Sequence, residues 1–116
     1  MDHIHWKKLT NSPYLGEWDL PEGQDLLVTI KDIKIEKVKN QKGEEEELPI
    51  LYFAEALKPM VLNTTNLRAI SKATGSDYLD TWSGKKLQLY RELVFAFGEK
   101  RMAIRIRDFA PEVHET

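Results

Sequence analysis

The chain has 116 residues, enough for one domain of ordinary size, with 41% hydrophobic residues and a net charge of −2. It contains no cysteine, which excludes disulfides, thiolate metal sites and cysteine nucleophiles. The charge gives no overall attraction to nucleic acid or to an anionic membrane, and no apolar stretch approaches the roughly 20 residues that a bilayer span requires. The N-terminus has no apolar signal core, so we expect a cytoplasmic protein with no membrane partner.

The first 25 residues show no sustained hydrophobic period and hold two of the five prolines and two of the six glycines. They also carry aromatic side chains, in which disordered segments are poor. We therefore predict an extended N-terminal arm over residues 1–25, packed on a barrel domain of residues 26–109, with a loose acidic tail over 110–116. The side chains expected to anchor the arm are Trp6, Tyr14, Leu15, Trp18 and Leu20.

The stretch DLLVTIKDIKIEKV predicts one long strand from its β-branched content and its alternation. The apolar residues up to Ile30 share one face, whereas Ile33 and Ile35 have the opposite parity. A change of parity inside one strand predicts a bulge or sharp bend near Lys31 and Asp32. A small barrel needs such a bend where its first strand pairs on both sides.

A polar loop around Gly43 follows, with four consecutive glutamates, and LPILYFAEA and KPMVLN then predict a second strand and a short third one. Pro59 lies near the start of the third strand, where a missing N–H is tolerated. The glutamate run has two interpretations: a solvated hairpin tip, in which like charges repel each other, or an acidic docking patch.

The segment LNTTNLRAISKATG predicts the one helix of the chain. Asn63 and the two threonines after it can cap the helix start. Leu67, Ile70 and Ala73 recur at three-residue spacing and give a narrow apolar stripe. Gly75 is placed to end the helix in the left-handed conformation.

Two alternating stretches close the chain, KKLQLYRELVFAF and KRMAIRIRDF, and predict a hairpin that turns near Gly98 and Glu99. The predicted order is therefore three strands, a helix and two strands. This is the order of the OB-fold, a mainly β, five-stranded Greek-key barrel, in which a helix between strands three and four plugs the open end. Trp82 and Gly84 would turn the chain at the barrel rim. An irregular β-sandwich carrying one helix is the main alternative.

Three segments, KPMVLNTTN, TWSGKKLQLY and AIRIRDF, resemble parts of a group of small phage and prophage proteins. These carry a K-P-x-V-L-N-x-T-N segment and a W-x-G-K segment ahead of an aliphatic strand, and the likeness covers roughly residues 14–108. The resemblance implies an OB-type single-stranded DNA-binding protein of phage replication or recombination, acting in the host cytoplasm. The patterned positions are Lys58, Asn63, Asn66, Trp82, Gly84 and Lys85.

No catalytic constellation can be assembled from the sequence. The three histidines lie near the ends of the chain, and His3 and His5 fit a flexible tail better than a metal site. There is no phosphate-binding glycine loop, nucleophile elbow or metalloprotease helix. The glutamate run is too local and too exposed to form an acid/base pair. We therefore predict no enzymatic activity, no cofactor and no metal.

The charge is unevenly distributed along the chain. From Lys85 to Arg107, seven basic residues stand against two acidic ones, a net of +5 that leaves −7 for the remainder. Arg105 and Arg107 project from one face of a strand, about 6.6 Å apart at two strand rises, close to the phosphate spacing of an extended single strand. Lys100 and Arg101 lie in the loop that OB-folds use for oligonucleotides. The opposing interpretation is cross-strand pairing of these arginines with carboxylates.

Binding of single strands also requires flat rings on which bases stack. Tyr90 lies on the polar face of strand four, and Tyr52 is a candidate on strand two. Trp82 is interpreted as rim packing more than as a stacking ring, and Asn63 and Asn66 as cap or turn residues more than as ligands. The predicted nucleic-acid-binding residues are Arg105, Arg107, Arg101, Lys100, Tyr90, Lys86, Lys85, Tyr52 and Lys58.

Two functions from different classes stay open. The first is sequence-tolerant binding of single-stranded DNA, with RNA not excluded. The second is a protein-binding OB module, such as an adaptor, a virion component or an inhibitor of a host system, whose acidic remainder would dock to a partner or mimic DNA. A homo-oligomer is compatible with either function, because single OB domains gain affinity by multiplying sites.

Overall fold

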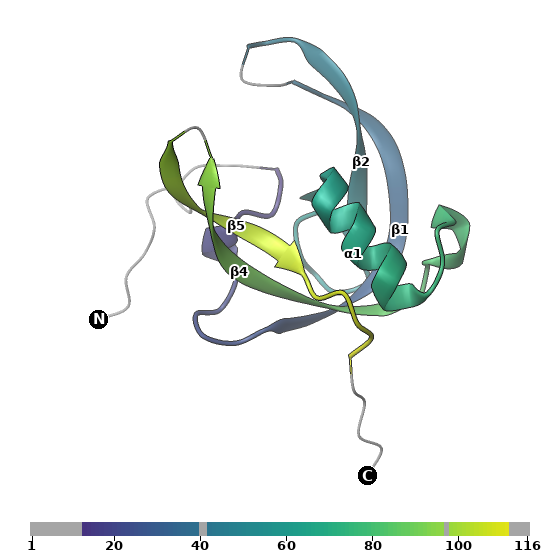
Figure 1. The fold of residues 1–116 in the computed structure, drawn as a ribbon. Helices are drawn as coiled ribbons and strands as arrows, with labels where there is room; N and C mark the ends of the chain where they lie inside the picture. The colour runs from purple at the N-terminus through teal and green to yellow at the C-terminus, as the bar shows by residue number, and fades with distance from the viewer. Residues whose placement is uncertain (1–12, 40–41, 97, 112–116) are drawn as a thin grey trace.

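The computed structural model describes residues 13–39, 42–96 and 98–111 and shows a mainly β protein, with one five-stranded antiparallel sheet and one α-helix (Figure 1). The described part of the chain has no helix long and apolar enough to cross a membrane. The predicted order of three strands, a helix and two strands is confirmed. The elements are η2 (Glu17–Asp19), β1 (Leu26–Lys39), β2 (Glu45–Phe53), β3 (Met60–Val61), α1 (Thr64–Thr74), η3 (Leu79–Thr81), β4 (Lys86–Ala96) and β5 (Glu99–Ile106).

The strands lie in the order β3-β2-β1-β4-β5, and β1 changes partner along its length. Its first residues, 26–29, pair with β4, and it pairs with β2 from Ile30 onward. The register of the β1–β2 ladder shifts between Ile30 and Asp32, so the bulge predicted from the parity change is confirmed. The extra residue lets Ile30, which is 1% exposed, and Ile33 both pack against the hydrophobic core despite their odd spacing.

The sheet is open, so the predicted closed barrel is not observed. β3 and β5 form its two edges, and no ladder joins them among the described residues. β3 has only two paired residues before the chain turns into α1, which leaves little backbone for a second ladder. The N-terminal segment lies along this seam instead: the Leu15 N–H donates to the Pro59 carbonyl at 2.8 Å, and η2 contacts β5.

Local capping defines α1 as the sequence predicts. The Asn63 side chain accepts a hydrogen bond from the Asn66 N–H at 2.8 Å, and Gly75 ends the helix with a φ of 74°. Ile70 is fully buried, and Leu67 and Ala73 pack partly buried against the core. The predicted apolar stripe therefore faces the sheet, while the opposite face of α1 is left to solvent and faces the viewer in Figure 1.

The core also includes side chains from outside the sheet and helix. Leu15 and Leu20 of the N-terminal segment are 8% and 5% exposed, whereas the predicted anchor Trp6 lies outside the described residues. Trp82, expected at a barrel rim, is 2% exposed in the hydrophobic core, and its Nε1 donates to the Ser76 carbonyl at 2.8 Å. The other buried apolar side chains are Val28, Ile30, Ile50, Leu51, Phe53, Met60, Leu62, Ile70, Leu87, Leu89 and Ile106.

Three of the four glutamates of the run lie in β2, and Glu44 precedes it. Glu45 and Glu47 begin β2, opposite Lys39 and Lys37 of β1, and Gly43, with a φ of 81°, lies in the turn before them. Opposite charges that face each other across two strands attract, which offsets the repulsion within the run. The part of the run in β2 is therefore compensated by β1 and is less suited to act as an isolated acidic patch.

Candidate nucleic-acid interface

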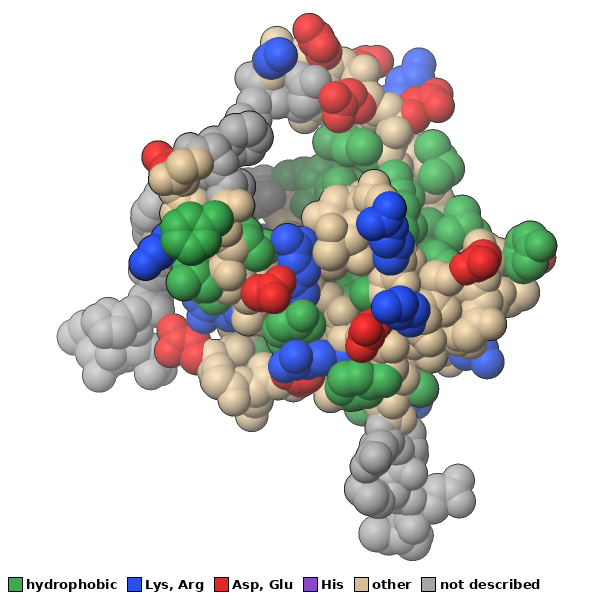
Figure 2. Space-filling model, in the orientation of Figure 1, with side chains coloured by type: hydrophobic (Ala, Val, Ile, Leu, Met, Phe, Trp, Pro, Cys, Tyr) green, Lys and Arg blue, Asp and Glu red, His purple; other side chains and the backbone are tan. Residues whose placement is uncertain are grey.

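A groove of about 430 Å³ lies between α1, the middle of β4 and the end of β5. We call it the α1–β5 groove. On the face drawn in Figure 2, Lys and Arg side chains gather over α1 and the end of β5, with carboxylates and hydrophobic side chains between them. The residues lining the groove are Thr65, Asn66, Arg68, Ala69, Lys72, Tyr90, Glu92, Arg105, Ile106, Arg107, Asp108 and Phe109.

Two of the four cations in the groove come from α1. Arg68 and Lys72 are four residues apart, so they lie on the same side of the helix, and both are exposed. The Lys72 ammonium lies 3.9 Å from Asp108, with both side chains more than half exposed. Arg68 has no ion-pair partner in the described part of the chain. These two cations are therefore accessible to a ligand in the groove.

Arg107 is held by a bidentate contact. Its Nε and Nη2 donate to the Asp25 carboxylate at 2.8 and 3.0 Å, and its guanidinium lies 3.6 Å from the centroid of the Tyr90 ring. The Gln88 amide donates to the same carboxylate at 3.1 Å. The hydrogen bond from Arg107 lowers the pKa of Asp25 below its usual 3.8, and the same bond raises the pKa of Arg107. Arg107 is thus rigidly placed, and Asp25 compensates its charge.

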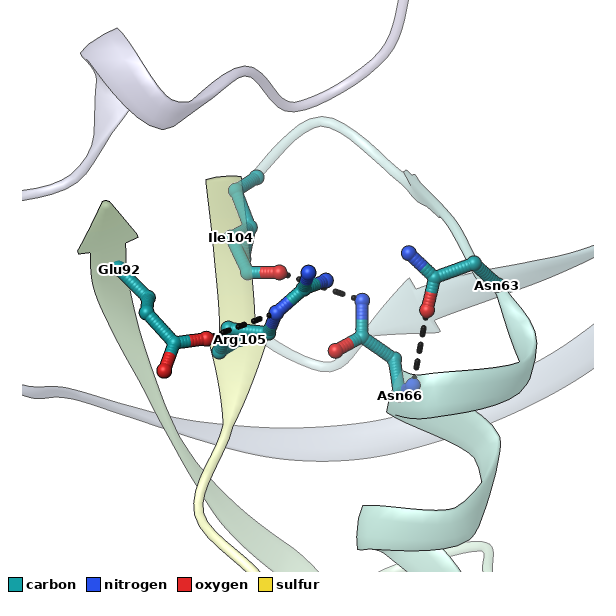
Figure 3. A network of polar contacts seen from close by, with 5 residues as sticks. All are labelled: Asn63, Asn66, Glu92, Ile104 and Arg105. Carbon is teal, nitrogen blue, oxygen red and sulfur yellow. Dashed lines mark hydrogen bonds and ion pairs between the residues drawn. The ribbon is translucent and has the colours of Figure 1, made fainter. Parts of the chain in front are cut away.

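Arg105 is also paired. Its Nε donates to Glu92 on the neighbouring strand at 3.0 Å, and its side chain is 17% exposed (Figure 3). Arg105 of β5 and Arg107, one residue after it, therefore both contact carboxylates, and the Arg105–Glu92 contact is the cross-strand pair that the opposing interpretation expects. A count of basic residues in the sequence overstates the positive charge that this hairpin presents.

The groove brings together three of the predicted nucleic-acid-binding residues, Tyr90, Arg105 and Arg107, and the other six do not line it. At the far end of the hairpin, Arg101 contacts Glu99 at 3.2 Å, and the Lys100 ammonium lies 5.6 Å from the centroid of the Phe95 ring.

The four remaining candidates are dispersed over other elements. Tyr52 lies on β2, where it donates to the Glu36 carboxylate, and this hydrogen bond raises the pKa of the Tyr52 hydroxyl. Lys85 and Lys86 are exposed at the start of β4, and Lys58 precedes β3.

Several groove residues were missed from the sequence. Arg68 and Lys72 could have been found, because cations four residues apart on the polar side of a predicted helix mark one exposed face. Phe109 follows the last strand and is 52% exposed. Asn66, expected to be a cap or turn residue, lies in the first turn of α1; it is also 2% exposed, and its Nδ2 donates to the Ile104 carbonyl at 3.3 Å. It thereby joins α1 to β5 (Figure 3).

A second notable surface lies toward the tip of the β4–β5 hairpin. Leu93 and Phe95 are 55% and 75% exposed, although they have the same parity along β4 as the buried Leu87 and Leu89. This side of the strand is interrupted by Arg91, which pairs with Glu17, and becomes apolar again toward the exposed tip. Among the described residues, no group of three or more His, Asp or Glu side chains is placed to hold a metal ion, and the three histidines lie outside them.

Comparisons of this chain with protein-family models, with curated proteins and with solved structures find no match. The resemblance to small phage proteins therefore stays a prediction from the sequence segments.

Proposed function

We propose that the protein binds single-stranded DNA without catalysis and without sequence preference, with the α1–β5 groove as its binding site. The observation that supports this function is the gathering of four cations and two aromatic rings, Tyr90 and Phe109, around one hollow. Contacts between cations and phosphates supply affinity that is independent of sequence. Rings on which bases stack contribute about 1 to 3 kcal/mol per base and tolerate any base.

The ion pairs in the groove determine which cations act first. An ion pair near the surface contributes about 0 to 1 kcal/mol, so a phosphate can compete with a carboxylate for a partly exposed arginine. Arg68 and Lys72 need little or no such exchange, because they are exposed and only Lys72 has a carboxylate, at 3.9 Å. We expect these two residues to make the first phosphate contacts. Arg105 and Arg107 would contact phosphates once these displace their carboxylate partners.

The proposed function is associated with an OB-fold and with a role in a phage. The strand order, with a helix between β3 and β4, fits an OB-fold whose β3–β5 ladder is replaced by the segment Leu15–Leu20. Lys100 and Arg101, expected in the loop but located in the first residues of β5, are further contacts on this proposal. The likeness to phage proteins favours a role in phage replication or recombination.

Titration of fluorescent oligo-dT at 50 and 200 mM salt tests this function. Each phosphate contact on a single strand contributes a slope of about −0.7 in log affinity against log salt, so four contacts predict an affinity about 50-fold weaker at the higher salt. The Arg68→Ala/Lys72→Ala variant should bind more weakly and lose about half of that slope.

A matched control removes two lysines elsewhere. Lys37→Ala/Lys39→Ala carries the same change of charge on β1, on a hairpin that does not line the groove, and should retain most of the affinity. Equal losses in the two double variants would contradict the assignment to the groove. Absence of any oligonucleotide binding by the wild type would contradict the function itself.

Protein binding is the second candidate, and the exposed Leu93 and Phe95 favour it. Solvent-exposed apolar side chains that adjoin one another are typical of surfaces that bind another protein. On this alternative, Leu93→Ser/Phe95→Ser leaves the fold intact and abolishes capture of a partner, while neither wild type nor variant binds oligo-dT. Retention of the partner by the variant would remove the hairpin tip from consideration.

A further inference from the structure

Asn66, in the first turn of α1, is a buried polar side chain that is only half satisfied. It is 2% exposed, its backbone N–H donates to Asn63 Oδ1, and its Nδ2 donates to the Ile104 carbonyl. Its Oδ1 is also buried but accepts no hydrogen bond in the described part of the protein. Native proteins rarely leave such an atom without a partner, so a specific explanation is needed.

The position of this oxygen points to a ligand. Figure 3 shows Asn66 reaching from α1 toward β5, with Oδ1 turned toward the strand at Arg105. Asn66 and Arg105 both line the α1–β5 groove and also a second hollow of about 250 Å³, which extends toward Leu15 and Trp18. Arg105 binds Glu92 through Nε, and within the described residues its two Nη atoms have no partner. The Asn66 Oδ1 acceptor and the Arg105 Nη donors, all without partners among the described residues, therefore belong to residues that line the same groove.

This combination matches the hydrogen-bonding edge of an unpaired base. Thymine carries N3–H beside O4, cytosine an amino group beside N3, adenine an amino group beside N1, and guanine N1–H beside O6. Base pairing occupies all of these groups in a duplex. A site with one acceptor and adjacent donors can therefore bind any base that is unpaired and none that is paired.

We propose that Asn66 Oδ1 accepts a hydrogen bond from the Watson–Crick edge of one unpaired base, with an Nη of Arg105 donating to the neighbouring acceptor of that base. The proposal rests on the single-strand-binding function of the groove and adds to it a means of selecting single strands over duplex. Selection for the unpaired state needs no preference among the four bases, which is consistent with sequence-tolerant binding.

A methylated oligonucleotide tests this contact. In an eight-nucleotide oligo-dT made from N3-methylthymidine, a methyl group replaces the hydrogen of the N3–H donor. The phosphates, the sugars and the thymine ring available for stacking are unchanged. Wild-type protein should bind the methylated oligomer about tenfold more weakly than oligo-dT, because the buried acceptor then stays unpaired. This comparison requires no variant, so it stands even where a substitution impairs folding.

Two variants assign the effect to Asn66. Asn66→Leu should bind both oligomers with the affinity that the wild type has for the methylated one. Asn63→Ser changes the neighbouring asparagine but keeps a capping hydroxyl, so it should discriminate as the wild type does.

Three results would overturn the proposal, and they differ in whether they also contradict single-strand binding. Equal binding of both oligomers by the wild type, or discrimination that persists in Asn66→Leu, excludes the contact but leaves single-strand binding in place; a buried water would then satisfy Oδ1. Failure of the wild type to bind either oligomer removes the proposed function and the base contact together.

Discussion

Arg107 makes more side-chain contacts than the other three cations of the α1–β5 groove. Asp25 holds its guanidinium fork in the plane that a bidentate contact requires, and the Tyr90 ring covers it at 3.6 Å. A guanidinium fixed in this way loses little conformational entropy when it changes partner, because its rotamer is already selected. The arrangement supports the fold, by joining the residue before β1 to the end of β5, and keeps a cation oriented toward the groove.

The Asp25–Arg107 contact predicts a pH dependence of stability. Because Arg107 lowers the folded-state pKa of Asp25 below 3.8, the contact stabilises the protein fully above the unfolded-state pKa and is lost as the pH falls through the folded-state value. Wild type should therefore lose more stability between pH 7 and pH 3 than Asp25→Asn does. Urea unfolding at the two pH values measures this difference. Asp80→Asn, at an exposed aspartate in η3, is the control and should behave as wild type; a wild-type-like acid response of Asp25→Asn would contradict the assignment.

Side-chain partners at this scale could not be predicted from the sequence. Arg107 and Asp25 are 82 positions apart, and nothing local in the chain indicates that the residue before β1 lies beside the end of β5. The parity of Arg105 and Arg107 correctly predicts that both line the same groove, although Arg107 lies one residue beyond β5. Whether these arginines meet a phosphate or a carboxylate depends on Asp25 and Glu92, which the parity argument leaves out. Of the nine predicted residues, only Tyr90, Arg105 and Arg107 therefore lie together in the groove, and both arginines are paired with carboxylates.

Helix α1 performs several roles with eleven residues. Its buried face carries Ile70 into the core, its exposed face presents Arg68 and Lys72, and its first turn reaches β5 through Asn66. Weakening the start of the helix should therefore affect both stability and the groove.

The helix cap gives a prediction with a definite magnitude. Asn63→Ala removes the acceptor for the Asn66 N–H and should lower the free energy of unfolding by about 1 kcal/mol, as measured by urea denaturation. Thr64→Ala, at the next and also exposed position, should change it by about 0.5 kcal/mol or less. Equal effects at the two positions would show that the cap contributes nothing specific.

Elements defined by local chemistry were predictable. The cap at Asn63, the left-handed Gly75 and the bulge near Lys31 each follow from a few adjacent residues, and the structure confirms all three. The glutamate run shows where local reasoning fails. Repulsion among neighbouring glutamates suggested a loop, whereas the turn at Gly43 sets a register that places Lys39 opposite Glu45.

At the scale of the whole molecule, the open seam between β3 and β5 is the main departure from expectation. Barrel closure depends on how many residues of β3 form a ladder and on which segment covers its edge. Neither can be predicted from a short sequence motif. The segment from Leu15 to Leu20 covers the seam with two buried leucines and one backbone hydrogen bond to Pro59. The N-terminal segment is thereby part of the core.

This packing predicts that the N-terminal segment is needed for stability. Leu15→Ala should lower the free energy of unfolding by about 2 kcal/mol or more, because it leaves a cavity where the core meets the seam. Leu27→Ala, at a leucine of β1 that is 49% exposed, should have a much smaller effect. Urea unfolding followed by tryptophan fluorescence and by circular dichroism provides the measurement. Unchanged stability of Leu15→Ala would show that the packing of this segment on the sheet contributes nothing to the free energy of unfolding.

The extra residue at Lys31 also has a consequence for how the sequence can vary. Side chains alternate sides along a strand, so losing or gaining one amino acid between Ile30 and Ile33 would turn every later residue of β1 over. Ile33 would then point to water, and Lys34 would point to the interior. We therefore expect natural or engineered forms of this protein to accept many substitutions at position 31 while rejecting any change in its length there.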